Sequence, residues 1–179
     1  MFALKLVVLC VLLACAIWSD VRERRIPNRL VAGGACAGLA LSLLPGQDGL
    51  AQAGAGLLLG FAFLLPFYLL GTMGAGDVKL MAAVGTFLGV TGTIGATLLT
   101  LLAGGVLAIL VAWRTGSLPA ALRNVRNFAM DCALWIGHGP SLGKPQLISS
   151  ASRLPYSVAI AAGVVSYLAA QFYYTSMGN

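Results

Sequence analysis

Two carboxylates, Asp20 and Asp77, stand at the ends of apolar stretches in a chain that contains five acidic residues. Asp20 closes the first apolar run and Asp77 opens the fourth. A carboxylate next to hydrocarbon is costly and is therefore a functional candidate. Two such groups placed close together share one proton, because repulsion and desolvation oppose a second charge. One can take a proton from water while the other polarises a carbonyl oxygen, which is the chemistry of metal-free amide hydrolysis.

Each carboxylate also has a structural interpretation. Asp20 can be the polar flank of a span, and Asp77 can be a helix N-cap, a position that Asp favours. The glycines before it favour a functional role, because Gly74 and Gly76 allow positive φ and close approach of an extended substrate. Lys79 can pair with the substrate, act on the Asp77 carboxylate or simply anchor the helix at the interface. The remaining acids have ordinary solvated interpretations: Glu23, Asp48 and Asp131.

The composition places these acids in a membrane protein. Of the 179 residues, 59% are hydrophobic and 9% are charged, whereas soluble domains carry roughly 25% charged residues. This excludes a soluble enzyme, a nucleic-acid-binding domain and a disordered tail. At about 20 residues per helix, the chain has room for five to seven spans. The four cysteines form no C-x-x-C pair, so we expect no disulfide, no zinc site and no cofactor.

The apolar runs predict an all-α polytopic membrane protein, with residues 1–179 forming a single membrane-embedded domain. We expect six spans: 1–18, 30–44, 50–70, 78–90, a fifth that follows a connection at 91–93 and ends at Trp113, and 154–174. Pro27 suits the start of the second helix. The first run also resembles a signal peptide, but a retained helix is the simpler interpretation. Glycines at five positions are expected to pack helices closely: 54, 56, 60, 104 and 105.

A different pattern separates the last two spans. Apolar residues recur there at spacings of three and four, with Arg and Asn between them, which predicts an amphipathic helix lying on the membrane surface. Its apolar positions are Leu118, Leu122, Val125, Ala129, Cys132 and Ile136.

The basic residues predict the orientation. With the N-terminus outside, the inside segments are 19–29, 71–79 and 114–153, and they hold every Lys and Arg except Lys5. Basic residues collect in cytoplasmic loops. We therefore expect both termini outside, and Asp20 and Asp77 at one depth on the cytoplasmic side.

The two acidic motifs together resemble the type IV prepilin peptidases, intramembrane aspartic proteases of the G-x-G-D type. The matching segments are Asp20-x-Arg22, Ile26-Pro27-Asn28 and Gly74-Ala75-Gly76-Asp77-Val78-Lys79-Leu80. The small size is similar to the Flp/Tad pilus branch, the TadV- or CpaA-like peptidases. Residues 153–160 are also similar to a segment of that branch, although Ser157 stands where glycine is more usual. The likeness covers most of the chain in length and order of elements.

The resemblance implies that Asp20 and Asp77 are the catalytic pair. Such enzymes remove the short basic leader of prepilins and pseudopilins at the cytoplasmic face of the inner membrane. The substrate's apolar N-terminal helix is expected to bind laterally and to unwind near Gly74 and Gly76, and Lys79 is a candidate contact for a Glu early in the mature substrate. Larger relatives also methylate the new N-terminus and carry a C-x-x-C insertion, which this sequence lacks, so peptidase activity alone is expected. The implied partners are these substrates and the lipid bilayer, not nucleic acid, and no oligomeric state is indicated.

Two other functions remain open from the sequence. A small proton or ion transporter could use Asp20 and Asp77 as its relay, and it predicts acids near mid-membrane with broken helices or inverted repeats. A non-enzymatic subunit of a pilus or secretion platform would tolerate replacement of either Asp by Asn.

Overall fold

The described part of the chain is helical. The computed structural model describes residues 2–44, 49–120, 122–127, 130 and 156–177, and no strand occurs among them. Four of the described helices are long and apolar enough to cross a membrane: α1 (Phe2–Glu23), α3 (Gly49–Leu69), α4 (Ala75–Arg114) and α6 (Tyr156–Met177). The predicted all-α membrane protein is confirmed. Helix α2 spans Asn28–Ser42.

The turn between α1 and α2 is built by local interactions. The first helix continues past the predicted end at Trp18 and stops where Arg24 adopts a left-handed φ of 51°. The Ser19 hydroxyl donates a hydrogen bond of 2.7 Å to the Arg25 carbonyl and ties the turn back onto α1. Pro27, with φ −62° and ψ 130°, is the residue before α2. The predicted helix start at Pro27 is therefore confirmed.

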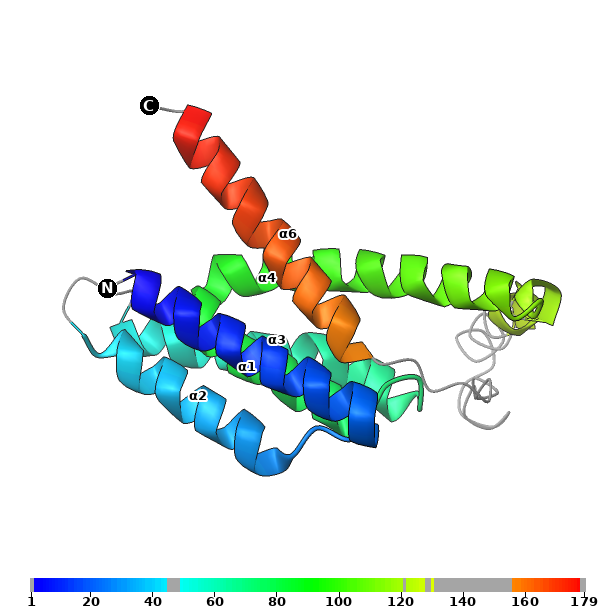
Figure 1. The fold of residues 1–179 in the computed structure, drawn as a ribbon, viewed down its shortest axis with the longest axis horizontal. Coiled ribbons are helices and arrows are strands. Elements are labelled where there is room, and N and C mark those ends of the chain that lie inside the picture. The colour runs from blue at the N-terminus through cyan, green and yellow to red at the C-terminus, as the bar shows by residue number, and fades with distance from the viewer. Residues whose placement is uncertain (1, 45–48, 121, 128–129, 131–155, 178–179) are drawn as a thin grey trace.

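The long helix α4 folds back on itself at Gly89. This glycine has φ 65° and ψ −169°, which interrupts the helix and suits a residue without a Cβ. Tyr156 contacts Gly104 and also lies within electrostatic range of Asp77. In a straight helix Asp77 and Gly104 would be about 40 Å apart at 1.5 Å per residue, too far for one tyrosine to lie near both. Figure 1 shows the change of direction between the two arms of α4.

The predicted connection at residues 91–93 is wrong by a few residues. Those residues are helical, and the break lies earlier, at Gly89. Gly92 and Gly95 instead face the Tyr167 ring of α6. Glycine and threonine in a row suggested a turn, but here they serve helix packing.

The number of spans stays a prediction. The second helix has 15 residues, or about 22 Å at 1.5 Å per residue, which is less than the ~30 Å thickness of the hydrocarbon core. Six spans require α2 to cross and each arm of α4 to count separately.

Glycines let the backbones of α3 and α4 come into contact. A Cβ on Gly56 or Gly60 would meet backbone atoms of α4, and a Cβ on Gly104 would meet the side chain of Tyr156. These three positions confirm the expectation of close packing. The expectation is wrong for Gly54 and Gly105, which have nothing within 4 Å.

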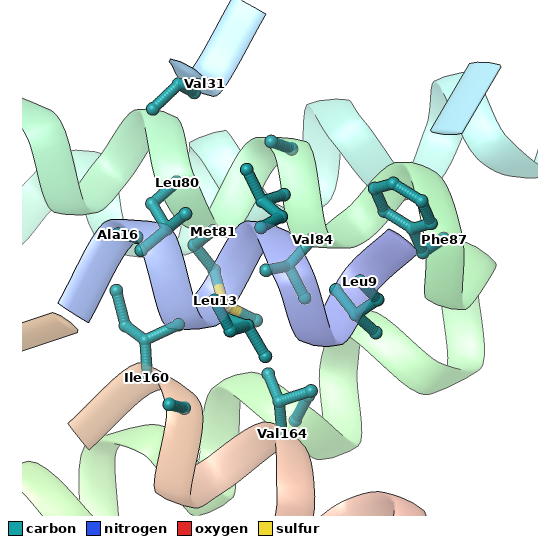
Figure 2. Close-up of a cluster of buried hydrophobic side chains, with 14 of the residues drawn as sticks. Leu9, Leu13, Ala16, Val31, Leu80, Met81, Val84, Phe87, Ile160 and Val164 are labelled. Atoms are coloured by element: carbon teal, nitrogen blue, oxygen red, sulfur yellow. The ribbon is translucent and has the colours of Figure 1, made fainter. Parts of the chain in front are cut away.

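The largest apolar cluster joins α1, the first arm of α4 and α6 (Figure 2). Most of its buried side chains come from these helices, and Val31 of α2, Leu64 of α3 and Ala96 of the second arm of α4 complete it. The labelled members are Leu9, Leu13, Ala16, Val31, Leu80, Met81, Val84, Phe87, Ile160 and Val164. This cluster fixes the mutual positions of the three helices that carry the candidate site.

The predicted surface helix lies partly within the described residues. Residues 118–120 and 122–127 are helical, which agrees with its first half. Leu122 and Val125 are 64% and 62% exposed, so the described helices do not cover these apolar side chains. Its continuation through Cys132 and Ile136 lies outside the described residues.

Candidate active site

Asp20 is held by the first turn of α6. Near the end of α1, its Oδ2 accepts a 2.6 Å hydrogen bond from the Ser157 hydroxyl and a 3.3 Å bond from the Ser157 backbone N–H. Ser157 is completely buried, whereas Asp20 is partly exposed. The C-terminal end of α1 is thereby tied to the start of α6.

Asp77 lies in the first turn of α4 and is 9% exposed. Its Oδ2 accepts a hydrogen bond of 3.2 Å from the backbone N–H of Gly74, which is the N-cap residue of the helix. Asp77 therefore satisfies a backbone donor at the helix end, although it is not itself the N-cap. This contact serves the helix and also orients the carboxylate.

The glycines before Asp77 do not use positive φ, and that expectation is wrong. Gly74 is extended, with φ −77° and ψ 149°, and Gly76 lies within α4. What these glycines provide is close approach. A Cβ on Gly74 would lie 3.1 Å from the Asp77 Oδ2, and a Cβ on Gly76 would lie 3.2 Å from the Cβ of Ile26.

The fold brings Asp20 and Asp77 together. The two carboxylates are close enough to repel each other electrostatically when both are charged. The half-buried Tyr156 phenol, next to Ser157, is also within electrostatic range of Asp77. Neighbouring residues at the start of α6 thus face both acids.

Two contacts attach the turn after α1 to the start of α4. Ile26 packs against the open face of Gly76. The ammonium group of Lys79 donates a hydrogen bond of 3.0 Å to the Asn28 side-chain oxygen on the exposed surface. The Ile26-Pro27-Asn28 segment and the Gly74–Leu80 segment, which both carry the resemblance noted in the sequence, are therefore neighbours in space.

The other acidic residues do not join this group within the described residues. Glu23 is exposed at the end of α1. The described residues contain no cluster of three or more His, Cys, Asp or Glu side chains that could hold a metal ion. The chemistry available at this site is that of paired carboxylates, one partly exposed and one buried. Asp48 and Asp131 lie outside the described residues.

Sequence reasoning missed the part played by Ser157 and Tyr156. Both belong to the segment that matched by resemblance, but neither was given a role there. The contact between Ser157 and Asp20 joins residues 137 positions apart, which no local pattern reveals. A weak signal was available, because Ser157 is a small polar residue at the cytoplasmic end predicted for the last apolar run.

The model of the type IV leader peptidase family matches residues 7–109, which is more than half of the chain and includes both acids. The chain therefore belongs to the type IV leader peptidase family. No curated protein and no solved structure gave a significant match.

Family membership defines the protein as a protease that acts on prepilin-type substrates in a membrane. Its apolar helices agree with a multi-pass membrane protein. This result favours the peptidase over the transporter and the platform subunit. In addition, both acids lie near helix ends rather than at the middle of the candidate spans.

Proposed function

We propose that Asp20 and Asp77 are the catalytic pair of this leader peptidase. The assignment is supported by the positions of the two acids at helix ends: Asp20 accepts a hydrogen bond from Ser157 at the start of α6, and Asp77, in the first turn of α4, lies within electrostatic range of Asp20. When two carboxyl groups lie close together in a poorly solvated place, one can act as the base and the other as the acid. The assignment accounts for both acids with one mechanism.

The proposed reaction needs water and one shared proton. The charged carboxylate takes a proton from water as the water oxygen bonds to the scissile carbonyl carbon, and the protonated carboxyl donates to the carbonyl oxygen. The resulting gem-diol then collapses: the C–N bond breaks, the leaving amine takes the proton held by the first carboxyl, and one gem-diol hydroxyl returns its proton to the second carboxylate. A carboxylic acid and an amine are released, and neither a covalent intermediate nor a metal ion takes part.

We assign substrate contacts to the exposed rim beside Asp77. Gly74 is exposed, and any side chain there would crowd the Asp77 carboxylate. An extended substrate backbone can use that free space. Lys79 is also exposed, and its ammonium has three donors, so it can keep Asn28 and still bind an early Glu of the substrate. The open face of Gly76 is filled by Ile26, so Gly76 acts through the backbone and through this packing.

The proposed cleavage occurs at the cytoplasmic face of the inner membrane, with both termini outside. The distribution of basic residues supports this orientation. Figure 1 agrees with two termini on one side, because the beginning of α1 and the end of α6 both lie toward the left of the view, whereas the end of α1 and the start of α6 lie toward the right. A basic leader held on the cytoplasmic side would then meet Asp20 and Asp77 directly.

Flp-type prepilins are the proposed substrates, and leader removal is the proposed activity without methylation. The similarity of residues 153–160 to the Flp/Tad branch supports the first statement. The second is supported by the four cysteines, which form no C-x-x-C pair. Mass spectrometry of the mature N-terminus tests both, because it reads the cleavage position and any added methyl group.

Co-expression with a Flp-type prepilin from the same genome tests the catalytic pair. Wild type is expected to shorten the prepilin on an immunoblot, and Asp20→Asn and Asp77→Asn are expected to leave it uncut while still inserting. Glu23→Gln is the matched control, because Glu23 is an exposed acid three residues beyond Asp20. Cleavage that survives either Asp→Asn change removes that residue from the mechanism.

A further inference from the structure

We propose that Ser157 is a positioning residue for Asp20. It holds this carboxylate in its charged form, so that Asp20 acts as the base and Asp77 carries the shared proton. The inference rests on the proposed function, in which the two carboxylates form the hydrolytic pair.

Both groups of Ser157 that can donate reach the same carboxylate oxygen. The hydroxyl lies 2.6 Å and the backbone N–H 3.3 Å from the Asp20 Oδ2. A backbone N–H can only donate, so this oxygen is an acceptor. A distance of 2.6 Å is typical of a hydroxyl bound to an ionised carboxylate. Because Ser157 is completely buried, its hydroxyl is shielded from bulk water and donates to Asp20 instead.

The start of α6 adds to the effect of the hydroxyl. Ser157 is the second residue of this 22-residue helix. N–H groups in the first turn have no partner within their own helix and carry partial positive charge. Asp20, from another helix, satisfies one of them and gains stabilisation of its negative charge.

Asp77 has a less favourable environment for a charge. It is 9% exposed and accepts a single bond from the Gly74 N–H, at 3.2 Å. Desolvation disfavours an ionised carboxyl that has few donors. When the pair holds one proton, that proton therefore resides on Asp77, where it can be donated to the substrate carbonyl.

The other titratable groups near the pair do not produce this difference. Tyr156 of α6 faces Asp77, and a phenol is ordinarily neutral below about pH 10. Lys79 of α4 is exposed and bound to Asn28. The end of α1, the following turn and the start of α2 contribute exposed charges at Arg22, Glu23, Arg24, Arg25 and Arg29. Ser157, by contrast, donates to Asp20 and not to Asp77.

Ser157→Ala removes the hydroxyl and keeps the backbone N–H. The charged form of Asp20 is then less stable, so the proton moves toward Asp20 and fewer molecules hold the productive arrangement. We expect kcat to fall about tenfold with little change in KM, on the scale of one charge-assisted hydrogen bond. We also expect the acidic limb of the pH–rate profile to move up by about one pH unit, because the carboxylate pair loses a donor that favours its singly protonated, charged form.

The test measures cleavage of a purified prepilin by the full chain in detergent across pH. The variants are Ser157→Ala and Ser157→Cys, whose thiol is a weaker donor of similar size and should give a smaller shift in the same direction. Ser42→Ala is the matched control, because Ser42 is also buried but donates to its own helix, to the Leu39 carbonyl. The control should leave the acidic limb in place.

An acidic limb that moves for the Ser157 variants and not for the control supports the proposal. The same limb as wild type, or an equal loss at every pH, overturns it and leaves Ser157 a packing residue. If Ser157→Ala does not accumulate, Ser157→Cys decides by the same criterion. These results are separate from the proposed function, which fails only if Asp20→Asn or Asp77→Asn still cleaves.

Discussion

Replacing Gly85 with alanine tests whether backbone contact between α3 and α4 holds the bundle. In the structure, Gly85 lies directly against Gly56. A Cβ on Gly85 would contact the Gly56 carbonyl oxygen and would lie 2.5 Å from its carbonyl carbon. Both groups belong to helix backbones, so no side-chain rotation can relieve the contact.

The size of the effect follows from that distance. An ordinary contact between carbon atoms is about 3.5–4.0 Å, so α3 and α4 must separate locally by about 1 Å. Overpacking of this kind typically destabilises by about 1–3 kcal/mol. Alanine also gains about 1 kcal/mol of helix propensity over glycine, which partly offsets the loss and has to be removed by a control.

Gly105→Ala is that control. Gly105 lies in the same helix, and a Cβ added there would meet nothing within 4 Å. This variant therefore gains the helix propensity of alanine without a steric clash against α3. Thermal unfolding in detergent, followed by circular dichroism, should show that Gly85→Ala is less stable than Gly105→Ala by the full ~1–3 kcal/mol. The unfolding midpoint should fall by roughly 2–4 °C for each kcal/mol. A midpoint for Gly85→Ala at or above that of Gly105→Ala would refute the packing argument.

Two further predictions concern the rim of the site and its metal independence. Lys79→Met should raise KM for a prepilin with an early Glu, whereas Asn28→Ala should change stability by less than about 1 kcal/mol and leave KM near wild type, because an exposed bond contributes little. Equal KM effects in steady-state assays of the two variants would mean that Lys79 acts through Asn28 alone. Treatment with a chelator such as EDTA should leave the cleavage rate unchanged, because paired carboxylates activate water without a metal; a loss restored by one added divalent ion would contradict the mechanism.

The meeting of the acids could be predicted from the sequence because it follows from the ends of helices. Asp20 closes an apolar run and Asp77 opens one, and the basic residues predict that both ends lie on one side of the membrane. The length of an apolar run and the charges beside it strongly constrain a membrane helix, so the positions of these two helix ends do not depend on tertiary contacts. The adjacency of Ile26 and Gly76 follows from the same arrangement.

Other features depend on contacts that local patterns do not encode. The reversal of α4 lies at Gly89, although the sequence near 91–93 looked more like a turn. A glycine reveals nothing about its own φ until its neighbours are known. The bond from Ser157 to Asp20 likewise arises only when α6 crosses the end of α1. Sequence periodicity predicts which residues are helical, but not where two helices cross.

The apolar core explains how a site made of few polar contacts can keep its geometry. One helical turn from Asp20 is Ala16, one turn from Asp77 is Met81, and close to Ser157 is Ile160, all of them completely buried in one cluster. Residues three or four positions apart lie on the same face of a helix. Each polar group is therefore placed by an apolar neighbour packed directly beneath it. The spacing of the two carboxylates is set mainly by this packing, and the hydrogen bonds of Ser157 and Gly74 then decide where the charge resides.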